Sequence, residues 1–265
     1  MRSLILGALC VATLLSGCIA PAADEPRLVR VLSYNIHHGE GTDGVFDLER
    51  LSRIIRRLEP DLVALQEVDQ GTSRASGVYQ ADELARLTDL EWRFGRAIHH
   101  DGGEYGEAVL SRWPIHESAA VPLPASPDHE LRCALTLRTG EGDDELLFIA
   151  THLDHTSEHT DRVSQMEAIL DSLAAEPDLP VLLVGDLNCE VGSPPLALLG
   201  PEWLDAPLAA GAPRPTFPAA DPKIRIDHVL ARPAQRWRVL QAEVIPEEVA
   251  SDHRPLLVVL ELLPE

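Results

Sequence analysis

A series of short apolar runs, separated by turn-rich loops and by segments with helical periodicity, limits the folds open to this chain. Runs of this length, bounded by turn residues, are typical of β-strands. The predicted strands are Leu28–Tyr34, Leu62–Leu65, Ala108–Leu110, Leu131–Leu137, Leu146–Thr151, Val181–Gly185, Ile224–Leu230 and Leu256–Leu262. No repeat, low-complexity block or linker interrupts them, so the pattern predicts one domain over residues 28–265.

Three segments between these runs have apolar residues at helical spacing. Asp47 can cap the first, whose apolar stripe runs from Leu48 to Leu58 and stops at Pro60. The second runs from Val163 to Leu173, and Ala81–Leu90 is a weaker third. Some strands are apolar on both faces and others alternate, which indicates two packed mixed β-sheets with helices outside. We therefore predict a four-layer α/β/β/α sandwich.

The N-terminus has the composition of an export signal. Arg2 supplies a positive start, Leu4–Leu15 is apolar, and Leu15-Ser16-Gly17-Cys18 has the small residues of a cleavage site. This apolar stretch is too short for a bilayer core that needs about 20 residues. Its Leu-Ser-Gly-Cys ending resembles a bacterial lipobox, which implies a lipoprotein signal peptide over residues 1–17 and a lipidated tether over residues 18–27. We therefore expect an exported protein, lipid-anchored at Cys18 in the bacterial cell envelope; ordinary secretion with a free terminus is the alternative.

Cysteine use fits an exported protein that is not built on disulfides. Cys10 is removed with the signal and Cys18 is lipidated, which leaves Cys133 and Cys189. These two could pair only if their Cα atoms lie within about 7 Å. The sequence leaves this pairing open.

The chain is strongly acidic, with 43 Asp plus Glu against 22 Lys plus Arg and a net charge of -21. Such a field repels nucleic acid and anionic membrane surfaces at long range. It argues against a protein that grips the DNA backbone, which normally has basic stripes. Because a bound metal offsets this charge locally, a nuclease is disfavoured without being excluded.

Polar residues collect at or just beyond the ends of the predicted strands, where open sheets usually place their sites. Taken singly, Glu67 could be a surface carboxylate, Asp186 and Asn188 an Asx turn, and His152 a structural histidine. These readings do not explain why all of them follow buried strands. The segments are Tyr34–Gly39, Gln66-Glu67, Thr151–Asp154, Gly185–Asn188, Asp227-His228 and Ser251–Pro255.

These segments supply an oxygen-rich set of side chains: Asn35, Glu67, Asp186, Asn188 and Asp252. Carboxylates and amides suit a hard cation such as Mg2+ or Mn2+. Hydrolysis of phosphate esters needs such a cation to neutralise the phosphoryl oxygens. Histidine, present in several of the same segments, suits proton transfer near neutral pH.

As an ordered set, these segments together with Glu107–Arg112 resemble the endonuclease/exonuclease/phosphatase superfamily. That superfamily includes secreted DNases, apurinic endonucleases, neutral sphingomyelinases and inositol-phosphate phosphatases. The resemblance spans Leu28–Leu262 and identifies the superfamily better than the substrate. It implies a metal-dependent hydrolase that cleaves phosphoester bonds by histidine-assisted attack of water.

The resemblance also implies roles for single residues. Glu67 resembles the principal metal ligand, with Asn35 nearby and Asp252 as a further ligand. His253 resembles a general base or a phosphate-contacting imidazole, oriented by Asp227.

Further roles follow for the remaining segments. Asp186 and Asn188 resemble the pair that positions the nucleophilic water and binds the scissile phosphate, and His152 resembles the second histidine of the DNase and sphingomyelinase branches. Glu107 stands where many relatives have asparagine; as in secreted DNases, it is expected to hold His152 as a charged general acid and to raise its pKa. A surface glutamate in a hairpin is the alternative. Thr216 resembles a family turn near the site and is expected to contact substrate.

The substrate rim is expected on the loop Gln70–Gln80, through Arg74 and Tyr79, and on His99–Tyr105. A small-molecule or lipid head-group phosphodiester fits the acidity and the anchor, and nucleic acid is the alternative. A nuclease would need basic or aromatic surface to grip a strand, yet aromatic residues are only 4% of the chain. Candidates for that grip are Arg74, Arg96, Arg112 and Arg132.

Two rival functions remain open, and a monomer is expected in each case. The first is a zinc hydrolase, because zinc accepts nitrogen and carboxylate ligands and His152, Asp154, His155 and His159 are close in sequence. The second is a non-catalytic surface lipoprotein that keeps the fold as a binding module. Loss of a metal ligand or of a catalytic histidine would indicate it, and neither is seen.

Overall fold

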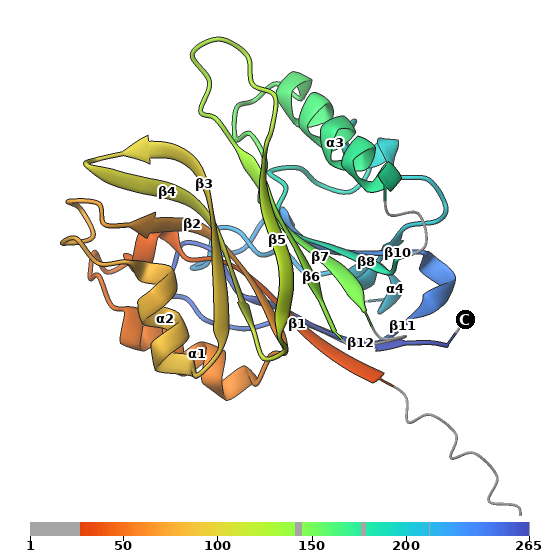
Figure 1. The fold of residues 1–265 in the computed structure, drawn as a ribbon, viewed down its shortest axis with the longest axis horizontal. Helices are drawn as coiled ribbons and strands as arrows, with labels where there is room; N and C mark the ends of the chain where they lie inside the picture. Colours follow the sequence, from red (N-terminus) through yellow and green to blue (C-terminus); the bar gives the residue numbers. More distant parts are fainter. Residues whose placement is uncertain (1–26, 141–144, 176–178, 212, 265) are drawn as a thin grey trace, which may run out of the picture.

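The computed structural model describes residues 27–140, 145–175, 179–211 and 213–264, and these form two β-sheets packed face to face with helices on the outer faces (Figure 1). The first sheet has the order β11-β12-β1-β2-β4-β3. Its strands are β1 (Arg27–Asn35), β2 (Leu62–Gln70), β3 (Glu91–His100), β4 (Gly103–Ser111), β11 (Trp237–Val244) and β12 (Leu256–Leu262). Strands β1 and β2 are parallel, whereas their other partners are antiparallel, so the sheet is mixed.

The second sheet has the order β5-β6-β7-β8-β10-β9 and is mixed in the same way. Its strands are β5 (Ile115–Pro122), β6 (Cys133–Thr139), β7 (Leu146–His152), β8 (Val181–Asp186), β9 (Leu204–Asp205) and β10 (Asp227–Arg232). Only β7 and β8 run parallel, and the remaining neighbours in this sheet are antiparallel. Between the sheets lies a core that includes Val31, Phe148, Val184 and Val258, all fully buried.

Helices cover the outer faces because each has one apolar side. Helix α1 (Leu48–Leu58) begins at Asp47, whose side chain accepts a hydrogen bond from the Arg50 amide at 2.8 Å. Its buried stripe packs with α2 (Gln80–Thr88) on the first sheet. Helix α3 (Thr160–Ser172) packs through Met166 and Ile169 on the second sheet. The four-layer sandwich predicted from the sequence is confirmed.

Four of the described strands were not predicted: β3, β5, β9 and β11. Each forms an edge of its sheet, and most residues of β5 and many of β11 are exposed. An edge strand keeps one side towards solvent and commonly has charged residues that block further pairing. Apolar runs therefore reveal central strands but not these edges.

The described cysteines Cys133 and Cys189 are buried free thiols, so the pairing left open by the sequence is not formed. In the described part of the chain, every helix is too short or too polar to cross a membrane. The predicted signal peptide and the lipidation site Cys18 lie outside the described residues.

Candidate active site

Strand register brings the site residues of the second sheet to one level. The parallel pairing of β7 with β8 sets His152 opposite Asp186, and the antiparallel pairing of β8 with β10 sets Asp227 opposite Asp186. A Cβ atom at Gly185 would clash with the carbonyl oxygen of Thr151, so glycine permits the close approach of β7 and β8 here. Three adjacent strands thus place a histidine and two carboxylates side by side.

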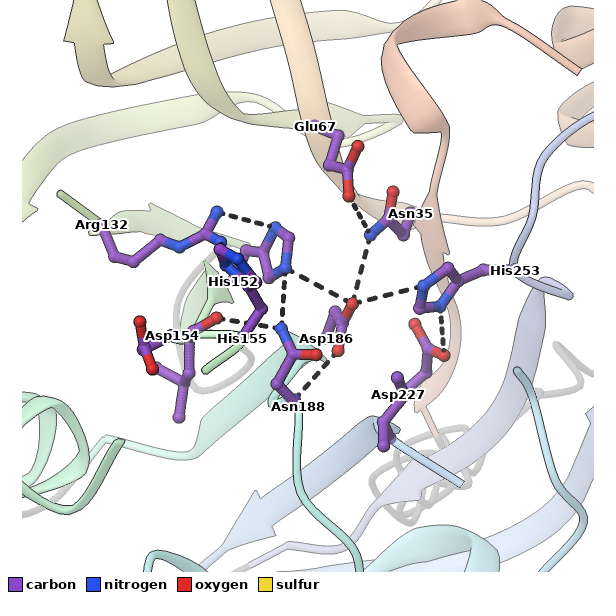
Figure 2. A network of polar contacts seen from close by, with 12 residues as sticks. Asn35, Glu67, Arg132, His152, Asp154, His155, Asp186, Asn188, Asp227 and His253 are labelled. Carbon is purple, nitrogen blue, oxygen red and sulfur yellow. Dashed lines mark hydrogen bonds and ion pairs between the residues drawn. The ribbon is translucent and has the colours of Figure 1, made fainter. Parts of the chain in front are cut away.

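Asp186 is the centre of the site, and groups from both sheets meet at its Oδ2 atom (Figure 2). This oxygen lies 3.2 Å from Nδ2 of Asn35, at the end of β1 in the other sheet. It lies 3.5 Å from Nε2 of His152 and 3.5 Å from Nε2 of His253. Burial raises the pKa of Asp186 to about 7, although the neighbouring His253 opposes this rise.

Glu67 reaches the site through an irregularity in β2. The pairing of β2 with β4 shifts register between Leu65 and Val68, and Glu67 has a φ of 59°, in the left-handed region. Bulges of this kind reorient side chains and are common beside active sites. The Glu67 carboxylate accepts a hydrogen bond from Nδ2 of Asn35 at 3.0 Å, and its side chain is 21% exposed. It is therefore the site carboxylate that is open to solvent.

His253 is held on a loop that is tied to both sheets. The Ser251 hydroxyl donates to the carbonyl oxygen of Asn35 at 2.7 Å, and Nδ1 of His253 lies 2.9 Å from Oδ2 of Asp227. Burial alone would lower the pKa of His253, but the carboxylates of Asp227 and Asp186 together raise it to about 10. The expected orientation of His253 by Asp227 is thus present, and the imidazole is positively charged at neutral pH.

His152 has the opposite environment, which corrects one expectation. Its Nδ1 atom faces Nη1 of Arg132 at 3.2 Å, not the carboxylate of Glu107 (Figure 2). Burial and the positive charge of Arg132 lower the pKa of His152 well below its ordinary value. The prediction of a charged general acid with a raised pKa is therefore wrong, because the neighbour at Nδ1 is a cation.

Glu107 is not the surface glutamate considered as an alternative, because it is fully buried. Neither of its carboxylate oxygens has a hydrogen-bond partner among the described residues, and burial raises its pKa well above the ordinary value. Arg132, whose charge opposes that rise, is itself only 3% exposed. From its sequence context Arg132 is only a candidate for gripping a nucleic acid strand, since nothing local to it indicates contact with a histidine twenty residues further on.

Asn188 lies beside His152 and Asp186. Its backbone amide donates to Oδ1 of Asp186 at 2.9 Å, which is the Asx turn considered in the sequence. Its side-chain nitrogen lies 2.9 Å from Nε2 of His152 and 3.0 Å from the carbonyl oxygen of Leu153. The Asx turn therefore belongs to the site, because it orients the side-chain amide of Asn188 towards His152.

The loop after His152 is braced by Arg162 and Gln165 of α3. Nη1 of Arg162 donates to the carbonyl oxygens of Asp154 and Thr156, and the Gln165 side chain accepts from the amide of Asp154. The zinc group considered as a rival does not form among the described residues. Nδ1 of His155 faces Arg132 and Nδ1 of His159 faces Arg162, so both imidazoles turn to guanidinium groups.

The remaining predicted positions lie further from the centre. No hydrogen bond or ion pair within the described chain joins the side chain of Asp252 to Glu67 or Asn35, so its role as a ligand stays a prediction. Arg74 binds the buried Asp69 at 2.6 Å, and Tyr79 is 61% exposed on the same loop. Thr216 is fully buried and its hydroxyl oxygen lies 3.4 Å from the amides of Ile226 and Asp227, so its expected contact with substrate stays a prediction.

The donor set fits a divalent cation. Glu67, Asp186 and Asp227 provide three carboxylates around the positive charge of His253, and Asn35 bridges Glu67 to Asp186. Carboxylate and amide oxygens are the ligands that hard cations prefer. Nδ1 of His38 lies 4.0 Å from Oε2 of Glu67, and both side chains are partly exposed.

The fold and this site define a two-sheet α/β protein with a carboxylate, amide and histidine centre, and comparison with known proteins agrees. The sequence matches the model of the endonuclease/exonuclease/phosphatase family over residues 32–253. The chain therefore belongs to the endonuclease/exonuclease/phosphatase family, whose common chemistry is phosphoester hydrolysis.

Individual relatives span the same region. Uncharacterized protein YbhP of Escherichia coli K12 is 28% identical over 256 residues, with 86% of this chain and 94% of YbhP covered. The crystal structure of an endonuclease/exonuclease/phosphatase from Beutenbergia cavernae is 26% identical with a TM-score of 0.75, covering 89% of this chain and 72% of that one. Mannosyl-6-phosphatase Bt3783 of Bacteroides thetaiotaomicron shares the fold at 21% identity and a TM-score of 0.71, covering 88% and 99%.

Proposed function

We propose that this protein is a divalent-metal-dependent hydrolase of phosphodiesters, acting on a small molecule or a lipid head group. The observation that supports this most directly is the convergence of Asn35, His152 and His253 on one oxygen of Asp186. Elements far apart in sequence supply these groups: β1, the end of β7, and the loop before β12. Membership of the family gives phosphoester hydrolysis as the reaction class.

Glu67 and Asn35 would hold the cation, with Asp252 as a further proposed ligand. When bound, Mg2+ or Mn2+ would neutralise phosphoryl oxygens and stabilise the charge that develops during attack. Glu67 suits this role because its carboxylate is solvent-accessible and oriented by the Asn35 amide.

The protein side chains divide the proton and charge chemistry between them. Asp186, with a pKa of about 7, is suited to accept a proton from the attacking water near neutral pH. Of the two roles expected for His253, contact with the phosphate is favoured, because its imidazolium charge is held by Asp227. Neutral His152 and the Asn188 amide would donate hydrogen bonds to the phosphate and to the leaving oxygen.

The cationic side chains argue for a small phosphodiester over a nucleic acid strand. Each arginine considered for gripping a strand is bound to an acidic group of the chain. Nucleic acid binding depends on cations that can neutralise phosphates along the strand. The pairs are Arg74 with Asp69, Arg96 with Glu104, Arg112 with Asp61, and Arg132 with Glu130.

A side-by-side assay tests the substrate. Bis-p-nitrophenyl phosphate, p-nitrophenyl phosphate, sphingomyelin, phosphoinositides and plasmid DNA would be compared with Mg2+ present, using the wild type and Glu67→Ala. We expect turnover of the small diester or of a lipid, with at least about a 100-fold loss in Glu67→Ala. Plasmid nicking at low enzyme concentration would instead establish a nuclease, and equal rates for both proteins would remove the proposed site.

We also propose that the mature protein is exported and anchored through a lipid on Cys18, which supports access to lipid head groups. The sequence Leu15-Ser16-Gly17-Cys18 after an apolar stretch supports this. In cells, wild-type protein should fractionate with membranes, whereas Cys18→Ser should not. Cys133→Ser is the matched control, because it alters a buried thiol elsewhere in the chain.

A further inference from the structure

A second group of metal-ligating side chains lies outside the proposed catalytic centre. It joins the loop between β5 and β6 to the segment that runs from β7 into α3. Nδ1 of His129 lies 2.7 Å from Oδ2 of Asp161 and 3.8 Å from Oδ1 of Asp154. One ligand atom from each residue lies within 4.8 Å of the other two.

The buried carboxylate of Asp154 distinguishes this group from an ordinary surface cluster. Asp154 is fully buried, and its Oδ2 is engaged by the amide and hydroxyl of Thr156. Its Oδ1 has no hydrogen-bond partner within the described chain, although it points towards His129. A buried, unpaired carboxylate oxygen is costly, so a cation that binds there would remove a real penalty.

We propose that His129, Asp154 and Asp161 form a second metal site, selective for a zinc-class ion, that clamps the two loops beside the catalytic centre. One imidazole nitrogen and two carboxylates are a donor set that zinc accepts, with solvent as the fourth ligand. Four-coordinate zinc with ligands at about 2.0–2.1 Å separates those ligands by about 3.3 Å. The observed separations, 2.7 and 3.8 Å, lie on either side of this value.

Neighbouring groups of the chain hold the two carboxylates in place, and the partly exposed His129 leaves the group accessible to solvent. The Ser126 amide and hydroxyl hold the Asp161 carboxylate at 2.9 and 2.6 Å, and Nη1 of Arg162 lies 3.8 Å from Oδ2 of Asp154. Supporting hydrogen bonds of this type orient metal ligands. The His129 side chain is 34% exposed, which gives an ion a path to the site.

Coordination of a cation by His129 requires an unprotonated ring nitrogen. Nδ1 of His129 lies 2.7 Å from Oδ2 of Asp161, and the tautomer decides which atom donates. A proton on Nδ1 would pass to solvent, or through solvent to Nε2, when the cation binds.

Short stretches of chain connect the proposed metal site to residues of the catalytic centre. Asp154 lies two residues after His152, and Arg132 lies three residues after His129. Arg132 contacts both His152 and His155. A bound ion would thus fix both loops that position these groups, without touching substrate.

The test is zinc binding in the presence of excess Mg2+, measured by calorimetry on the purified chain and located by anomalous diffraction at the zinc edge. We expect an anomalous peak between the three side chains and at least about tenfold weaker binding in His129→Ala. His99→Ala is the matched control, because His99 is an exposed histidine outside the group. It should bind zinc as the wild type does.

Thermal unfolding provides the second measurement. Zn2+ should raise the Tm of wild type and His99→Ala but not of His129→Ala, and circular dichroism of the metal-free variant checks that its fold is kept. His253→Ala removes the histidine of a separate histidine–carboxylate group, which His253 forms with Asp186 and Asp227, so zinc binding at His129 should persist in that variant. A wild-type chain that takes no zinc here, or a His129→Ala variant that binds equally well, would overturn the proposal.

Discussion

His152 and His253 approach the same oxygen of Asp186 at the same distance, 3.5 Å, yet their environments give them opposite charge states. His253 has a carboxylate at its far nitrogen, Asp227, which raises its pKa. At His152, burial lowers the pKa, and the guanidinium of Arg132 at the far nitrogen lowers it further. Both imidazoles are buried, so the charged partners determine whether burial is overcome, as at His253, or reinforced, as at His152.

The largest effect should come from removing the cation, because neither histidine can replace it at Glu67 and Asn35. Chelation should abolish turnover of bis-p-nitrophenyl phosphate, and Mg2+ or Mn2+ should restore it, because the carboxylates alone repel an anionic substrate. Rates before and after metal return measure this. Activity that persists after exhaustive chelation would contradict the proposed chemistry.

Replacing the charged histidine should cost more than replacing the neutral one. We expect His253→Ala to lower kcat/KM by at least about 100-fold and His152→Ala by about 10- to 100-fold, since a charged donor stabilises the transition state more. Steady-state kinetics give both values, and circular dichroism checks the fold. A fully active His253→Ala variant would remove its assigned role.

Removing the charged partner of each histidine should bring the pKa values of His152 and His253 closer together. Arg132→Met removes the cation beside His152, so the pKa of His152 should rise, and activity should fall by about tenfold. Asp227→Asn should lower the pKa of His253. Imidazole titrations by NMR on metal-free protein measure both shifts; an unchanged His152 in Arg132→Met would show that burial alone sets its state.

The smallest effect should be on stability. Because the pKa of His253 is raised on folding, its proton stabilises the native state fully below about pH 6.5, and this contribution is lost as the pH rises towards 10. The free energy of unfolding of metal-free wild type should therefore fall over this range relative to His253→Gln. Urea titrations at several pH values would measure the difference; parallel curves for the two proteins would count against a charged His253.

The sequence predicted the central strands and the helices because burial leaves a direct mark on residue pattern. Asp47 followed by an apolar stripe from Leu48 to Leu58 predicts a capped amphipathic helix, and this is helix α1. The edge strand Ile115–Pro122 has no such mark, because most of its side chains face solvent. Pattern therefore reveals layers and central strands better than sheet edges.

The sequence predicted which residues form the site, but not the protonation state of His152. Asn35, Glu67, Asp186 and His253 all follow or precede buried strands, so their convergence follows from sheet topology. The contact of Arg132 with His152 depends on a loop path that no local pattern encodes. It reverses the expected protonation of that histidine.

The left-handed backbone of Glu67 implies that a glutamate stands at a position where glycine would be less strained, because its carboxylate serves the site. A residue with a Cβ atom is strained in this region by about 1–2 kcal/mol, whereas glycine is not. Glu67→Gly should therefore eliminate activity without weakening the fold. The inactive Glu67→Gly variant would then have a free energy of unfolding at least equal to that of the active wild type.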